Sequence, residues 1–383
     1  GFMPLMPMYA QAFGASEGFS GLYVAFAYLC IAVGTMIGGR LADRLHSGRV
    51  LLAAAGGCMA PATLLIGTVR TLWQVMLATG LQWLMAGVCL AAAGAVIGKE
   101  AAPDERGRAF GLVGMTIGLG ALIGGFSIGP MVDLRGYEMM FTVMAAVILL
   151  IPAAALLMVR ETKTRATAGA DPAKPTAAGG AAERGPAAQH GPGSSAPRRS
   201  RIEPVLVMLL LAQVLGMTAN GAGNMGRSVI MNGLRFSNTA ITTTAAVSGI
   251  VALPLPLLLG WLSDRTGRKA ILILSYLAGT ACLVMLIFSG RLWHFCAAAS
   301  LLSLLTVCMS VGPAFMTDIV RAENVGTGVA LCQSAQWIGM IIGFVYSGYA
   351  FSSIGKTAAL GSAGAAGIAA AILILLARRK TTR

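Results

Sequence analysis

Residues 260–269 read G-W-L-S-D-R-T-G-R-K, and residues 39–44 read G-R-L-A-D-R in a near repeat 221 positions earlier. Each copy directly follows a long apolar stretch. Each therefore places a short charged turn between two stretches that are long enough to cross a bilayer, which takes about 20 residues per helix. A charged turn that recurs in this setting indicates that a unit of several membrane helices has been duplicated.

The composition supports a membrane protein. Of the 383 residues, 56% are apolar and 11% are charged, and the mean hydropathy is +0.77. A soluble domain of this size would need more polar groups to cover its surface. The apolar stretches lack the period-2 alternation of strands, so we expect them to be helices, which satisfy their own backbone groups in lipid.

Hydropathy predicts eleven complete helical spans, at residues 20–38, 50–68, 74–98, 109–130, 138–159, 204–226, 240–262, 269–289, 292–316, 325–350 and 357–377. Ahead of them lies an apolar piece, residues 1–13, that is too short to cross a membrane. The internal repeat aligns Gly1 with Ala222, which leaves residues 204–221 without a counterpart in the first half. We therefore expect the first helix to be incomplete and the layout to comprise twelve helices. A cleaved signal peptide is the rival explanation, and a chain starting inside an apolar helix argues against it.

A linker separates the two halves. Residues 160–203 are rich in Ala, Gly, Pro and Ser and show no apolar periodicity, which favours a disordered tether over a regulatory element. The predicted organisation is a first bundle at 1–159, the linker at 160–203, a second bundle at 204–378 and a basic tail at 379–383. Arg198, Arg199 and Arg201 are expected to contact anionic lipid headgroups.

The net charge of +14 is distributed unevenly. With the charged turns inside the cell, the cytoplasmic side carries 22 of the 28 Lys and Arg residues. The outer side carries Arg70, Arg135, Arg227, Arg235, Arg291 and Lys356. This is the positive-inside bias. It predicts cytoplasmic termini and argues against a nucleic-acid partner.

Nothing in the sequence indicates an enzyme or a metal site. The seven cysteines lie in predicted spans without a C-x-x-C pair, so they are expected to be packing residues. No H-E-x-x-H motif or His/Asp constellation suggests catalysis, and we expect no cofactor. A receptor would more often carry a soluble signalling domain than this linker.

The paired turns resemble the pattern G-x-x-x-D-R-x-G-R-[RK] between helices 2 and 3 of the major facilitator superfamily, and its echo between helices 8 and 9. The resemblance implies two six-helix bundles related by a pseudo-twofold axis, as in parallel repeats. It also implies that the turns latch the protein between outward-open and inward-open states. The first copy departs from the pattern, with Leu45-His46-Ser47 ahead of Gly48-Arg49 where one residue is usual, and the charges could serve topology alone. The latch assignment covers Gly39, Asp43, Arg44, Gly260, Asp264, Arg265, Gly267 and Arg268.

Two further elements resemble bacterial drug and metabolite exporters in degraded form. Residues 120–125 read G-A-L-I-G-G, where proton-linked exporters have G-P-x-x-G-G, so Ala121 replaces the proline. The R-x-x-Q-G element of helix 4 is reduced to Trp83 and Ala86 before Gly87. Generic close packing of glycines explains the first element equally well. Both departures argue against the usual drug–proton antiport.

No carboxylate lies in the middle of a predicted span, although proton coupling usually requires a buried titratable group. Three alternatives stay open. Asp318 or His294 could serve from a helix end, residues upstream of Gly1 could supply an acid, or transport is not coupled to protons.

The helix at 204–226 and its edge carry the strongest candidates for a substrate cavity. Gln213, Asn220, Asn224 and Arg227 fall within about 60° of one another on a helix. Such a polar stripe should face the bundle interior, for substrate contact or for hydrogen bonds between helices. Weaker candidates are Gln82, Ser303, Thr306, Gln333 and Gln336.

Together these features predict a monomeric secondary transporter in a bacterial-type inner membrane, working by alternating access. Efflux of an amphipathic compound is favoured because the cavity candidates are mostly uncharged. Uptake of a small metabolite, by a permease or a facilitator, is the alternative. An anionic substrate would require a basic residue inside a span, and the prediction places Arg227 at the outer end only.

Overall fold

A computed structural model describes residues 2–45, 48–100, 106–158, 204–320 and 325–377. Within these ranges every regular element is helical, which confirms the predicted all-α membrane class. Nine described segments are long and apolar enough to cross a membrane. The predicted linker at 160–203 and the tail at 379–383 lie outside the described residues.

The first half of the chain forms a helical bundle whose long helices match the predicted spans. The predicted spans 109–130 and 138–159 form a hairpin that bends at Gly136, where φ is +77°. Glycine adopts that conformation without a steric penalty. The elements are η1 (Met3–Leu5), α1 (Met6–Ala12), α2 (Glu17–Leu45), α3 (Gly48–Thr68), α4 (Leu72–Glu100), α5 (Arg106–Ile148) and α6 (Leu150–Met158).

The second half forms a similar bundle, in which two predicted spans are broken. The span 240–262 breaks beside Pro254, as expected for a residue that lacks a backbone N–H. The span 292–316 breaks at Val307, ahead of Pro313, which lies inside the helix that follows the break. The elements are α7 (Pro204–Gly233), α8 (Asn238–Ala252), α9 (Leu255–Thr266), α10 (Arg268–Ile287), α11 (Leu292–Thr306), α12 (Cys308–Ile319), α13 (Val325–Ser353) and α14 (Lys356–Leu376).

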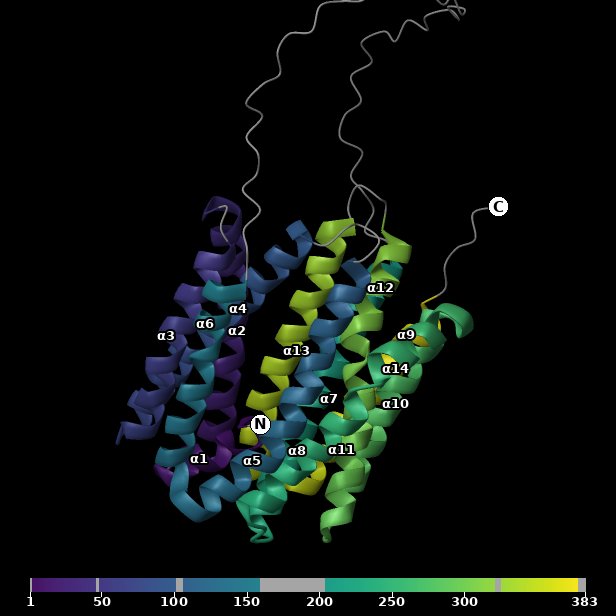
Figure 1. Ribbon diagram of the computed structural model, residues 1–383. Helices are drawn as coiled ribbons and strands as arrows, with labels where there is room; N and C mark the ends of the chain where they lie inside the picture. The colour runs from purple at the N-terminus through teal and green to yellow at the C-terminus, as the bar shows by residue number, and fades with distance from the viewer. Residues whose placement is uncertain (1, 46–47, 101–105, 159–203, 321–324, 378–383) are drawn as a thin grey trace, which may run out of the picture.

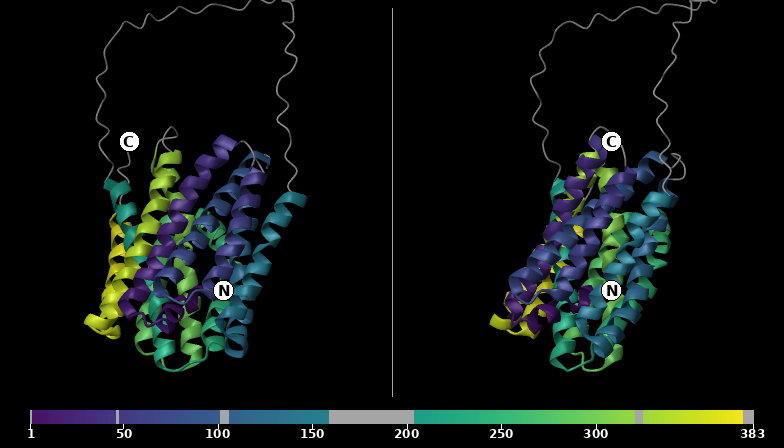
Figure 2. Two further views of the ribbon diagram at one scale, coloured as in Figure 1. Left: turned by 90° about the vertical axis from the view of Figure 1, so that its left-hand side faces the viewer. Right: turned by 60° about the vertical axis from the view of Figure 1, so that its left-hand side comes forward.

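The helices run between two ends of the molecule (Figure 1). The linker end holds the last residue of α6, Met158, and the first residue of α7, Pro204. The hairpin end holds the bend at Gly136 and the connection from α7 to α8. The bundles meet along two helix pairs, α2 with α13 and α5 with α8. Figure 2 shows the same arrangement from two further sides.

The bundles approach most closely in the half of the molecule next to the hairpin end. A Cβ atom on Gly21 of α2 would lie 2.4 Å from the carbonyl oxygen of Phe344 and 2.8 Å from the Cα atom of Gly348, both on α13. Only glycine permits backbones to come this close. The α5–α8 pair shows a comparable approach at Gly125, which lies 11 positions before the bend at Gly136.

Candidate functional site

An acidic side chain joins the two bundles at the hairpin end. Asp133 of α5 accepts hydrogen bonds from the backbone N of Asn238 at 3.2 Å and its Nδ2 at 2.8 Å. It also accepts from the backbone N of Thr239 at 2.8 Å and its Oγ1 at 2.6 Å. The first amides of a helix lack partners within the helix, and a negative charge there is favourable. Asp133 therefore caps α8, a helix of the opposite bundle.

Further polar contacts between the bundles lie at the same end. Lys356 at the start of α14 pairs with Glu17 at the start of α2, with 3.4 Å between Nζ and Oε1. Asn232 of α7 donates to Gln11 of α1 at 3.2 Å. These contacts, with the close packing beneath them, close the hairpin end.

At the linker end, basic residues of the repeated turns bind within their own bundle. Arg49, at the start of α3, donates to the carbonyl oxygen of Leu156 near the end of α6. Lys269, at the start of α10, donates to the carbonyls of Leu375 at 2.7 Å and Ala377 at 3.1 Å, at the end of α14. The last carbonyls of a helix lack partners within it, and a cation there is favourable. Each turn thus fastens the last helix of its bundle.

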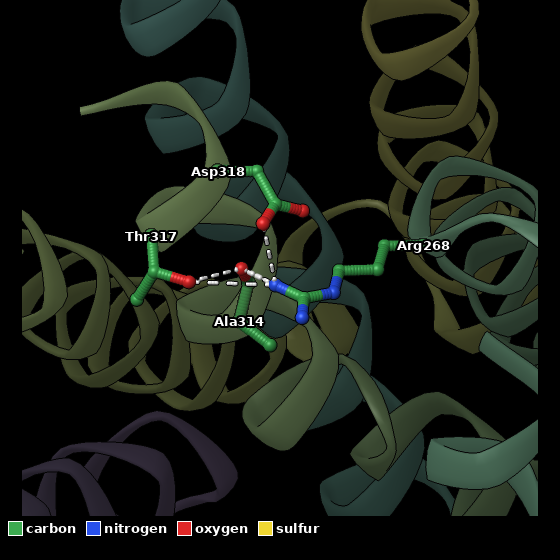
Figure 3. A network of polar contacts seen from close by, with 4 residues as sticks. All are labelled: Arg268, Ala314, Thr317 and Asp318. Carbon is green, nitrogen blue, oxygen red and sulfur yellow. Dashed lines mark hydrogen bonds and ion pairs between the residues drawn. The ribbon is translucent and has the colours of Figure 1, made fainter. Parts of the chain in front are cut away.

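A second contact of the 260–269 turn reaches α12 (Figure 3). Arg268 forms an ion pair with Asp318, 3.1 Å between Nη1 and Oδ1, and donates to the hydroxyl of Thr317 at 3.4 Å. It also donates to the carbonyl of Ala314. The structure thus joins a predicted latch residue, Arg268, to a predicted coupling residue, Asp318.

The remaining latch residues make fewer described contacts. Gly267 has a φ of +92° and makes the turn between α9 and α10. Arg265 lies over the ring of Trp261, 3.9 Å from its centroid, in a cation–π contact. Arg44 is exposed, and a Cβ on Gly39 would meet no atom within 4 Å. Nothing is described for the side chains of Asp43 and Asp264 or for the surroundings of Gly260.

The polar stripe of α7 lies inside the second bundle. Gln213, Asn220 and Arg227 have exposed fractions of 0%, 1% and 4%, and Asn224 is half-buried. Arg227 is not at the end of its helix, as the sequence suggested, because α7 continues to Gly233. The residues after Arg227 include no proline and no glycine before Gly233, so nothing ends the helix earlier.

Gln213 binds Gln336 of α13. The Nε2 atom of Gln336 donates to Oε1 of Gln213 at 3.3 Å and to the carbonyl of Cys308 at 3.2 Å. Nε2 of Gln213 donates to the same carbonyl at 3.5 Å. These two glutamines therefore connect helices inside one bundle, which was the alternative to substrate contact.

The other candidates are dispersed. Ser303 of α11 shares a hydrogen bond of 2.7 Å with Ser248 of α8. Thr306 and Gln333 are exposed, and Gln82 is half-buried. His294 accepts from the backbone N atoms of Gly290 at 3.3 Å and Arg291 at 3.2 Å, which makes it a cap for the start of α11.

An aromatic cluster between the bundles was missed by the sequence reasoning. Tyr28 of α2 lies 5.3 Å from Trp83 of α4, and 5.9 Å and 5.2 Å from Trp337 and Phe344 of α13, between ring centroids. Trp83 and Trp337 are half-buried. Aromatic faces bind apolar and cationic groups. Tyr28, Trp83 and the α13 pair lie in three segments that are far apart in the sequence, so only the fold could reveal the cluster.

The described residues contain no group of three His, Cys, Asp or Glu side chains that could hold a metal ion. The seven cysteines are free thiols. Between the bundles, the described side chains offer aromatic rings, amides and hydroxyls, together with the charges of Asp133, Glu17 and Lys356 at the hairpin end. The guanidinium of Arg227 lies inside the second bundle.

Comparison with known proteins gives a family. The sequence model of the Major Facilitator Superfamily matches residues 1–225 and again residues 209–383. Multidrug resistance protein MdtG of Citrobacter koseri is 31% identical over 164 residues, which is 42% of this chain and 40% of that protein. MdtG of Enterobacter lignolyticus is 31% identical over 164 residues, 42% of this chain and 39% of that protein. The matched stretch thus spans about two fifths of these relatives.

Solved structures share the fold. The peptide transporter POT in complex with sulfate superposes with a TM-score of 0.75 at 13% identity, covering 98% of this chain and 90% of that one. A POT family transporter in complex with 5-aminolevulinic acid gives 0.74 at 12% identity, covering 100% and 93%. At these identities the likeness establishes the arrangement of helices.

Proposed function

The chain belongs to the major facilitator superfamily, and we propose that it moves a small organic solute across a bacterial-type inner membrane by alternating access, as a monomer. One observation carries the proposal. The contacts that seal the bundles together, from Asp133 to the start of α8 and from Glu17 to Lys356, lie at the hairpin end. Alternating access requires such contacts to form in one state and break in the other. On this proposal, the structure represents the state in which the hairpin end is closed.

The proposed substrate is an amphipathic compound, and the proposed direction is efflux. The aromatic cluster of Tyr28, Trp83, Trp337 and Phe344 supplies an adaptable apolar surface where the bundles meet. The relatives named as multidrug resistance proteins support efflux. Uptake of a charged metabolite is the second candidate, and the buried guanidinium of Arg227 is the observation that favours it.

The aromatic cluster gives a direct test of this function. Trp337→Ala should weaken the apparent affinity for an uncharged apolar dye about fivefold, since an aromatic contact contributes about 1 kcal/mol. Dye movement would be measured in proteoliposomes with an imposed pH gradient. The matched control is Trp73→Ala, an exposed tryptophan at the start of α4. Equal losses in both variants, or no dye movement in the native protein in either direction, would reject the proposal.

The orientation in the membrane is a separate proposal, with the linker end in the cytoplasm. Thr266 is exposed at the linker end and Thr71 is exposed at the hairpin end. Cysteine introduced at position 71 should react with a membrane-impermeant maleimide added to intact cells, and cysteine introduced at position 266 should react only after the cells are opened. The reverse pattern would invert the topology.

We propose that the charged turns act as the latch at the linker end and that Asp318 couples it to protons. His294 is the weaker coupling candidate because its ring nitrogen already caps α11. Protonation of Asp318 would remove its attraction for Arg268 and loosen α12 from α10. Asp318→Asn should therefore slow transport about fivefold and flatten its dependence on the pH gradient. Unchanged gradient dependence would remove Asp318 from this role.

A further inference from the structure

We propose that Arg227 and the asparagines one and two turns before it form an anion-binding site inside the second bundle, which holds the carboxylate of an amphipathic substrate. This proposal rests on the proposed transport function and adds the chemical class of the substrate. The site lies within α7, about 9 Å before the hairpin end of that helix at 1.5 Å per residue.

Arg227 is a buried cation without an acidic partner among the described residues. Its exposed fraction is 4%, its Nε atom has no hydrogen-bond partner, and its Nη2 atom donates to Oδ1 of Asn224 at 3.4 Å. Two acids at the hairpin end are engaged elsewhere, Glu17 with Lys356 and Asp133 with α8. The neighbouring groups on α10 and α11 are the thiols of Cys282 and Cys296.

The hydrogen bonds along α7 have a fixed direction. An arginine side chain can only donate, so Asn224 must turn its oxygen toward Arg227. The Nδ2 atom of Asn224 then donates to Oδ1 of Asn220 at 2.8 Å. This leaves the Nδ2 atom of Asn220 as a second buried donor without a partner, at a residue that is 1% exposed. Both unpartnered groups are donors, which an acceptor ligand satisfies and a cationic ligand does not.

The buried guanidinium of Arg227 calls for a counter-charge. An ion kept in the interior without a partner destabilises the folded protein. A carboxylate matches the forked geometry of a guanidinium and forms two parallel hydrogen bonds with it. Leu283 of α10 and Leu302 of α11 lie beside Gly223, which is on α7 between Asn220 and Arg227. The side chains that α10 and α11 place against this part of α7 are therefore apolar. The unpartnered donors and these leucines together match the chemistry of an anionic group carried on an apolar body.

The test uses the purified full chain in nanodiscs and three ligands of one shape: 4-phenylbutyrate, 4-phenylbutyramide and 4-phenylbutylamine. Binding is measured by thermal shift and by isothermal titration. The butyrate should bind at least tenfold more tightly than the amide or the amine. Arg227→Gln should remove that preference, whereas Arg135→Gln, at an exposed arginine of the hairpin end, should preserve it.

A second variant keeps the proposal testable if Arg227→Gln fails to fold. Arg227→Lys retains the charge and loses the fork, so it should weaken butyrate binding by about tenfold. Equal affinity for the three ligands, or a butyrate preference that survives both variants, would overturn the site.

A chloride titration distinguishes a site for an inorganic anion from a site for the carboxylate of an organic substrate. A thermal shift by chloride that depends on Arg227 and that butyrate cannot displace would identify an inorganic ion and overturn the substrate proposal. Movement of the uncharged dye by the native protein would leave the transport function standing even then.

Discussion

Replacing Gly125 with valine should prevent the hairpin end from closing and lower transport at least tenfold. A Cβ atom at this position would lie 2.5 Å from the backbone N of Ala246, 2.7 Å from its Cβ and 2.7 Å from the carbonyl oxygen of Thr242. These are mainly backbone atoms, which cannot turn aside as a flexible side chain can. Relief requires α5 to move away from α8, and that movement separates the bundles at the closed end.

The control is Gly120→Val on the same helix, where a Cβ would meet no atom within 4 Å. Both variants add the same side chain to α5, so both carry the same change in helix propensity. Transport in proteoliposomes and the distance between spin labels on Leu134 and Leu234, which are exposed on opposite bundles, would be measured together. Equal behaviour of the two variants would show that the approach at Gly125 is not required for closure.

The glycines of α5 show what could and could not be predicted from the sequence. The series from Gly120 to Gly125 had two explanations, close packing or an exporter motif. At Gly125 the structure provides close packing against the opposite bundle, while Gly120 has open space beside it. The spacing alone could not separate these positions, since the difference depends on which face of α5 meets α8.

Membrane helices were predictable because their signal is local. Apolar length located the spans, and the repeated turn indicated two bundles. Contacts that cross from one bundle to the other, such as Asp133 with Asn238 or Tyr28 with Trp337, depend on packing between distant segments. Arg227 was assigned to a helix end because the apolar span was ended at residue 226, just before it. A charge does not stop a helix; an unfavourable backbone residue does.

Asp133→Ala should open the hairpin end, through electrostatics and not through steric pressure. The substitution removes four hydrogen bonds to the first residues of α8 and the negative charge that caps that helix. Asp133 is exposed, so solvent screening limits its hydrogen bonds, taken together, and its helix-terminal charge to about 1 kcal/mol or less for each of these two effects. A loss of about 1–2 kcal/mol should shift the ratio of closed to open molecules about 5- to 30-fold.

The charge and the hydrogen bonds can be separated by a second variant. Asp133→Asn retains an acceptor oxygen and loses the charge. Its ratio of closed to open molecules should therefore lie between that of the native protein and that of Asp133→Ala. Glu138→Ala is the control, since this exposed acid lies just beyond the Gly136 bend and not at the start of α8. High salt should also weaken closure in the native protein, because screening acts on exposed charges. If the label distances on Leu134 and Leu234 stay unchanged in Asp133→Ala, the carboxylate does not hold this end closed. Closure would then rest on the α5–α8 and α2–α13 packing alone.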